Sequence, residues 1–214
     1  VCSCLNAYYA RVQNEELSRL LDLGTQSFET FSFEVYSPYQ ILNRSVSPRE
    51  NMERIYDTCR DYAYEFSSRS TNLLLSGDPG LGKTFLSACI ARVVSEKGHS
   101  VVYDTANHIF ARFEAQKFSA DEDAEEDVGR YLHCDLLILD DLGTEMITDF
   151  VRSALYQIVN TRLMTGKQTI ISTNLSPEAI GQRYGAAILS RVEGEYQILP
   201  FFGEDIRKKQ RNKG

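Results

Sequence analysis

The chain has 214 residues, of which 43% are hydrophobic, and it carries a formal net charge of −7. This length is enough for one sizeable core, or at most two small domains, without support from disulfides or structural metals. No run of about 18 uncharged apolar residues is present, which excludes a transmembrane helix, and we expect a cytoplasmic protein with no membrane partner. The acidic balance excludes a surface that is basic throughout, but it allows a local basic patch.

Residues 1–46 are predicted to form a linker that precedes the globular part. The aromatic-rich stretch at residues 28–39 shows no clear period, and we expect its rings to pack on another part of the protein. Cys2 and Cys4 form a closely spaced pair at the start of the chain. Tetrahedral zinc needs four ligands, and no second pair lies nearby, so these two cysteines are either a chance pair or half of a metal site.

The globular part is predicted to open with a helix at residues 48–66. Ser47 supplies an N-cap, Pro48 occupies the first helical position and Glu50 the third, which together form a capping box. Apolar residues then recur at spacings of three and four. We expect this helix to bury one apolar face.

Strands and helices are predicted to alternate along the rest of the chain. Apolar and β-branched runs predict the strands, and apolar residues at helical spacing predict the helices between them. The expected strands are 72–76, 101–103, 136–139, 169–172 and 196–199, and the expected helices include 82–96, 106–117, 151–163 and one that begins at Ser176. This order predicts an α/β fold with a parallel five-stranded sheet and helices on both faces.

Two charge runs are expected to be solvated. Six acids lie within residues 121–127 and predict an acidic loop. Five bases lie within residues 207–214 and predict a basic C-terminal tail.

Residues 77–84 match the pattern G-x-x-x-x-G-K-[ST] between a predicted strand and a predicted helix, as a P-loop requires. Its glycines allow a tight turn whose N–H groups point at phosphate oxygens, and the helix that follows adds its positive N-terminus. Lys83 supplies a charge to the β- and γ-phosphates, and Thr84 supplies a hydroxyl for Mg²⁺. The expected nucleotide-binding residues are Gly77, Asp78, Pro79, Gly80, Leu81, Gly82, Lys83, Thr84 and Phe85.

Two other predicted strands end in polar side chains. Asp140 and Asp141 follow an aliphatic run, and a metal ion would offset the cost of burying two carboxylates. We predict that Asp140 joins Thr84 in a Mg²⁺ shell and that Asp141 orients or polarises the attacking water. Asn174 follows the strand 169–172, at the edge where sites on open α/β sheets lie. We predict that it holds this water or contacts the γ-phosphate; the alternative is an ordinary turn residue.

Other nucleotide-binding classes fit less well. The guanine-binding signature Asn-Lys-x-Asp is absent, which argues against a small GTPase. A nucleotide kinase needs arginines near its second substrate, whereas the segment between the strands at 101–103 and 136–139 is acidic.

The segments GDPGLGKT, LLILDDLG, ISTN and RYGAAILSRV, in this order, resemble the AAA+ ATPases of the bacterial replicative helicase loaders, the DnaC/DnaI type. The IstB-type transposition helper ATPases are close relatives of these loaders. The resemblance covers residues 28–210 and implies an AAA+ domain at residues 47–206 whose lid domain is truncated or absent. Its more specific parts are the paired aspartates followed by Leu-Gly and the Phe-Phe-Gly-Glu-Asp-Ile-Arg segment at 201–207.

The resemblance also implies roles for single residues. Arg191 matches the family's arginine finger, which acts in trans on the γ-phosphate bound to the next subunit. The alternative is a surface arginine on a helix, and Arg183 is a second candidate for the finger. Arg207 resembles a sensor arginine of the lid domain. Cys2 and Cys4 resemble the remnant of an N-terminal zinc-binding module, so zinc is expected only in a full-length protein.

The function implied by the resemblance is ATP hydrolysis coupled to loading of the replicative DNA helicase when DNA replication begins. The implied partners are that helicase, single-stranded DNA and further copies of the chain in the ATP state, with slow hydrolysis before assembly. Arg112, Phe113, Lys117 and Phe118 offer basic and aromatic contacts for DNA, or else pack an amphipathic helix into the core. The alternative functions are an IstB-like transposition helper and a nucleotide-dependent binding switch for a mobile element or phage.

Overall fold

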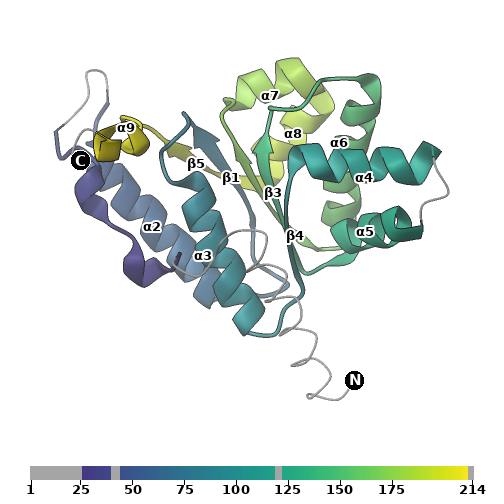
Figure 1. Ribbon diagram of the computed structural model, residues 1–214, viewed down its shortest axis with the longest axis horizontal. Coiled ribbons are helices and arrows are strands. Elements are labelled where there is room, and N and C mark those ends of the chain that lie inside the picture. Colours follow the sequence, from purple (N-terminus) through teal and green to yellow (C-terminus); the bar gives the residue numbers. More distant parts are fainter. Residues whose placement is uncertain (1–25, 40–43, 119–121, 212–214) are drawn as a thin grey trace.

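The structure is a computed structural model that describes residues 26–39, 44–118 and 122–211 (Figure 1). Cys2 and Cys4 lie outside these residues. None of the described helices is long and apolar enough to cross a membrane.

The centre of the molecule is a parallel sheet of five strands (Figure 1). The strands are β1 (Asn72–Gly77), β2 (Val101–Thr105), β3 (Leu136–Leu142), β4 (Gln168–Thr173) and β5 (Tyr196–Phe201). Their spatial order is β2-β3-β4-β1-β5, and each neighbouring pair is parallel. The predicted five-stranded parallel sheet is therefore confirmed.

Helices cover both faces of the sheet, as expected (Figure 1). One face packs against α2 (Pro48–Tyr64) and α3 (Lys83–Glu96). The other face packs against α4 (Ala106–Phe118), α5 (Glu122–His133), α6 (Asp149–Met164), α7 (Pro177–Tyr184) and α8 (Ala186–Glu195). Successive side chains of a strand point to opposite faces, so Leu73 and Leu75 enter the first core and Leu74 enters the second.

The predicted capping box starts α2. The Glu50 backbone N–H donates to Ser47 Oγ at 3.2 Å, and the Ser47 N–H donates to Glu50 Oε2 at 2.7 Å. Met52, Ile55 and Cys59 of this helix are buried against α3 and the sheet. The cap and the apolar spacing therefore place the helix as the sequence predicts.

The aromatic stretch before α2 packs on the first core. It contains two short 3-10 helices, η1 (Phe28–Thr30) and η2 (Phe33–Val35). Phe28 and Tyr36 are buried, and the Tyr36 hydroxyl donates to the Leu81 carbonyl of the P-loop at 3.0 Å. The rings thus fasten this stretch to α2 and the P-loop, while the domain boundary at residue 47 stays a prediction.

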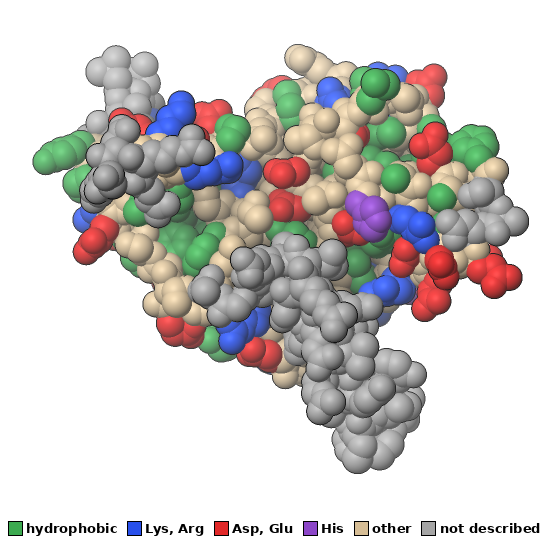
Figure 2. Space-filling view, viewed as in Figure 1, with side chains coloured by type: hydrophobic (Ala, Val, Ile, Leu, Met, Phe, Trp, Pro, Cys, Tyr) green, Lys and Arg blue, Asp and Glu red, His purple; other side chains and the backbone are tan. Residues whose placement is uncertain are grey.

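The acidic run is helical, so the predicted loop was wrong. Helix α5 begins at Glu122, and its buried residues Ala124, Val128 and Tyr131 recur at helical spacing. Glu125 and Glu126 between them face solvent, and the acids lie near the helix N-terminus, where negative charge is favourable. Figure 2 shows acidic side chains along the edge of the molecule where α5 lies.

Part of the predicted C-terminal tail after β5 is helical. Helix α9 (Ile206–Arg211) follows the strand, and no separate lid domain lies within the described residues.

Candidate functional site

The P-loop joins β1 to α3 and requires its glycines. Gly77, Gly80 and Gly82 have φ angles of 147°, 73° and 95°, which glycine adopts without strain. A Cβ on Gly77 would lie 2.0 Å from the Phe201 carbonyl oxygen, and one on Gly80 would lie 1.9 Å from Asp205 Oδ1. The segment after β5 therefore packs directly against the phosphate-binding loop.

Lys83 lies at the centre of the site. Its Nζ donates to the Gly77 and Asp78 carbonyl oxygens at 2.6 and 2.8 Å and to Asn174 Oδ1 at 2.8 Å. Burial lowers the pKa of Lys83, while the negative charges of Asp141 and Asp140 act in the opposite direction. The lysine thus connects the P-loop to the end of β4.

The two aspartates at the end of β3 have different surroundings. Asp140 is 4% exposed, and its Oδ2 accepts a hydrogen bond of 2.6 Å from the Tyr103 hydroxyl. Asp141 has a φ of 55°, in the left-handed region, where the pairing of β3 with β4 shifts register. Partial burial and then the neighbouring Asp140 raise the pKa of Asp141, while Lys83 and Arg207 lower it.

These elements surround a cavity of about 770 Å³. Its lining includes four residues predicted for catalysis or metal binding, namely Lys83, Thr84, Asp141 and Asn174. Five more of the predicted nucleotide-binding residues line it, namely Pro79, Gly80, Leu81, Gly82 and Phe85. Asp140, Gly77 and Asp78 are not among the lining residues. The carbonyl oxygens of Gly77 and Asp78 accept hydrogen bonds from Lys83, which does line the cavity.

Four lining residues were not assigned to nucleotide binding from the sequence: Gln26, Thr144, Ile206 and Arg207. The Ile206 N–H donates to the Gly80 carbonyl at 3.0 Å, which brings the start of α9 to the cavity. The Gly-Glu-Asp-Ile-Arg motif drew attention to this segment, but the sequence did not predict that the segment lies at the cavity. Gln26 had no sequence signal.

The cavity fits a nucleotide with Mg²⁺. The Gln26 Oε1 atom is buried and has no hydrogen-bond partner among the described residues, so it suits a donor such as the amino group of adenine. No group of three or more His, Cys, Asp or Glu side chains suited to a metal occurs in the described ranges. A Mg²⁺ ion at Thr84 and Asp140 would therefore take its remaining ligands from phosphate and water, as Mg²⁺ commonly does.

Arg191 lies outside this cavity. Its guanidinium donates to Asn160 Oδ1 at 2.7 Å and to the Tyr156 hydroxyl at 2.8 Å, and it lies 4.5 Å from the centre of the Tyr156 ring. These contacts hold it on the outer side of α6. Arg183 is also absent from the cavity lining, and it donates to the Glu145 carbonyl.

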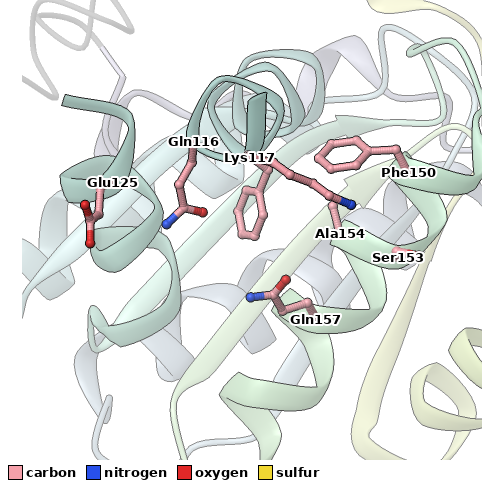
Figure 3. Close-up of a pocket in the computed structure, with 8 residues that line it drawn as sticks. Gln116, Lys117, Glu125, Phe150, Ser153, Ala154 and Gln157 are labelled. Atoms are coloured by element: carbon pink, nitrogen blue, oxygen red, sulfur yellow. The ribbon is translucent and has the colours of Figure 1, made fainter. Parts of the chain in front are cut away.

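A second cavity, of about 520 Å³, lies among α4, α5 and α6 (Figure 3). Of the four residues considered for DNA contacts, Phe113 is 4% exposed and Arg112 pairs with Asp127 at 2.7 Å. Phe118 is 70% exposed. The Lys117 Nζ atom lies 5.5 Å from the centre of the Phe118 ring and 5.2 Å from that of Phe150. The structure thus assigns Phe113 to the core and leaves Lys117 and Phe118 at the surface.

The parallel sheet and the P-loop between β1 and α3 define a P-loop fold of the AAA+ type. Residues 53–214 match the family described as IstB-like ATP binding protein, and the chain belongs to this family. It is thus a member of an ATP-binding family. The sequence motifs had already indicated a relationship to IstB-type ATPases, and this match confirms it.

Named relatives fall into two groups. The replicative helicase loader DnaC of Escherichia coli K12 is 26% identical over 146 residues, which cover 68% of this chain and 60% of DnaC. A putative insertion sequence ATP-binding protein, y4pL of Sinorhizobium fredii, is 30% identical over 155 residues, which cover 66% of this chain and 59% of y4pL. The chain therefore spans about 60% of the length of these relatives.

Solved structures show the same fold. A crystal structure of the DnaC helicase loader aligns with a TM-score of 0.66 at 22% identity and covers 82% of this chain and 98% of that one. A crystal structure of DnaI aligns with a TM-score of 0.65 at 19% identity, with 87% and 93% covered.

Proposed function

We propose that this chain is a cytoplasmic ATPase that binds ATP with Mg²⁺ in the P-loop cavity and uses hydrolysis to load a replicative DNA helicase onto single-stranded DNA. The observation that carries the hydrolytic part is the meeting of Lys83, Asp141 and Asn174 at one cavity. The helicase part is supported by the relatives named DnaC helicase loader.

The site residues predicted from the sequence each have a chemical task in this proposal. The P-loop N–H groups and Lys83 would hold the phosphates, and Thr84 and Asp140 would hold the metal. Bound Mg²⁺ would neutralise charge that develops on the phosphates. Asp141 orients the attacking water and Asn174 holds it in place, while Arg207 adds a positive charge from α9.

Arg191 is proposed to act in trans. Its contacts with α6 keep it away from the cavity of its own chain, so it would serve the site of a neighbouring copy. A guanidinium at the γ-phosphate stabilises the charge of the transition state. ATP-dependent assembly into a homo-oligomer follows, together with slow hydrolysis by the isolated chain.

Contact with single-stranded DNA is proposed for the mouth of the α4–α6 cavity. Lys117 supplies a positive charge between the Phe118 and Phe150 rings, and Phe118 is largely exposed. Aromatic rings beside basic groups are a common arrangement for binding unpaired bases and the strand backbone.

The second candidate is a transposition helper or a nucleotide-dependent binding switch for a mobile element or phage. The family match and the relationship to y4pL favour it. In the switch version, ATP binding controls the partner and hydrolysis is incidental. Both candidate functions keep the proposed domain division into 1–46, 47–206 and 207–214. They also keep the zinc module implied by Cys2 and Cys4.

A pull-down with the full-length protein distinguishes the candidates. The bait is loaded with ATP, with ADP or with no nucleotide, and Lys83→Ala serves as the nucleotide-binding control. ATP-dependent recovery of a replicative helicase supports the loader. Recovery of a transposase instead contradicts the loader and supports the helper.

A further inference from the structure

The turn that follows β3 carries a buried carboxylate to which the proposed chemistry gives no role. Glu145 is 5% exposed, although an ionised carboxylate is costly to bury. Its Oε2 accepts a hydrogen bond of 3.0 Å from the Gly143 N–H, and its Oε1 accepts one from the Tyr184 hydroxyl at the end of α7. The Arg183 guanidinium of α7 lies 3.5 Å from the same Oε1 and supplies the opposite charge. The side chain therefore ties the turn to α7.

Just before this turn, at the end of β3, Asp141 has an unusual backbone conformation. A non-glycine residue with a φ of 55° keeps that geometry only where its surroundings enforce it. Other contacts contribute: Thr144 Oγ1 donates to the Asp141 carbonyl at 2.9 Å, and Thr173 Oγ1 donates to the Leu142 carbonyl at 2.6 Å. These bonds fasten the turn to itself and to β4, whereas Glu145 fastens it to α7.

We propose that Glu145 is a positioning residue for hydrolysis, because it fixes the turn that presents Asp141 to the P-loop cavity. The inference rests on the proposed ATPase function. Glu145 does not line the cavity, so it acts through Asp141 and not on the nucleotide. Loss of its contacts should therefore slow the hydrolytic step and leave nucleotide affinity unchanged.

The test variant is Glu145→Gln, which keeps the shape of the side chain but removes its charge and one of its two acceptors. Tyr184→Phe removes one of the three contacts and leaves the Gly143 bond and the Arg183 ion pair. Asp135→Asn is the matched control, because Asp135 precedes the other end of β3, where it accepts bonds from Ser100 and Lys167. It changes a comparable polar network far from Asp141 along the same strand.

Each variant is assayed for affinity with a fluorescent ATP analogue, for single-turnover ATP hydrolysis at high protein concentration, and for thermal unfolding. Displacement of a catalytic group by about 1 Å can cost about 100-fold in rate, so we expect Glu145→Gln to slow hydrolysis by about 10- to 100-fold. Its affinity should stay within about twofold. Tyr184→Phe should have a smaller effect, and Asp135→Asn should lose stability but keep its rate.

Three results overturn the positioning role. They are a wild-type rate in folded Glu145→Gln, a loss of affinity as large as the loss of rate, and equal slowing by Asp135→Asn. If wild-type protein hydrolyses ATP and Lys83→Ala does not, the ATPase proposal stands whichever of these occurs. Absence of hydrolysis in wild-type protein at every concentration overturns both proposals.

Discussion

The P-loop cavity and the outer surface of α8 hold their basic residues in opposite ways. In the cavity, Lys83 is buried and bonds to groups of the same site. On α8, Arg191 bonds to Asn160 and Tyr156 of α6 and does not line the cavity. This difference supports the proposal that each chain supplies the phosphate-binding groups of its own site and that Arg191 serves the site of a neighbouring copy.

The largest effect is expected from a substitution of Arg191, the proposed trans finger. We predict that Arg191→Ala lowers the ATPase rate of the assembled protein by roughly 10³- to 10⁵-fold, the range measured for trans arginines. Nucleotide affinity and the slow rate of dilute monomer should not change. Steady-state assays over a range of protein concentrations check this. Full-speed hydrolysis by dilute monomer, with no effect of the substitution, would refute a trans finger.

The next largest effect is expected from a substitution of Lys83 in the P-loop cavity. We predict that Lys83→Ala weakens ATP binding by about 2–5 kcal/mol, because a buried charge partner of the phosphates is lost. Isothermal titration with ATP measures this. Lys167→Ala is the control, since Lys167 pairs with Asp135 away from the cavity. Unchanged ATP affinity in Lys83→Ala would contradict the assignment of this cavity as the nucleotide-binding site.

A substitution at Gly80 tests the contact between the P-loop and the segment after β5. Gly80→Ala should destabilise the fold by about 1–3 kcal/mol, because alanine is strained at a φ of 73° and its Cβ would meet Asp205. Gly98→Ala is a matched control, with a φ of 88° and nothing within 4 Å of its Cβ. Urea unfolding compares the two. Equal losses would mean that contact with Asp205 contributes nothing.

The smallest effect is a pH dependence of stability. The pKa of Asp141 is raised in the fold, so its charged form is disfavoured and stability declines as the pH rises through that pKa. We therefore predict that Asp141→Asn melts at a higher temperature than wild type at neutral pH. The difference should vanish below the usual aspartate range, near pH 3. Thermal melts from pH 3 to 8 without nucleotide check the sign; a lower melting temperature at neutral pH is the contrary result.

Much of this cavity was predictable because parallel strands end at one edge of the sheet. That rule places Lys83 near Asn174 although 91 residues separate them. Strand order and register were not predictable from apolar runs, so the bond between Tyr103 and Asp140 was not foreseen. The position of Arg207 depends on the packing of α9 against the P-loop, which leaves no local pattern.

The acidic run shows a different limit. Charged residues dominate residues 122–127, and the buried series Ala124, Val128 and Tyr131 is short. Local composition therefore favoured a loop, while packing of this series against α4 and α6 favours a helix.

In the proposed assembly, each active site combines the cavity of one chain with Arg191 of another. The most direct test mixes Asp141→Asn, whose cavity is inactive and whose finger is intact, with Arg191→Ala, whose cavity is intact. Each variant alone should have little ATPase activity. The mixture should regain activity, because some interfaces then pair an intact cavity with an intact finger. A mixture no more active than its separate components would contradict this arrangement.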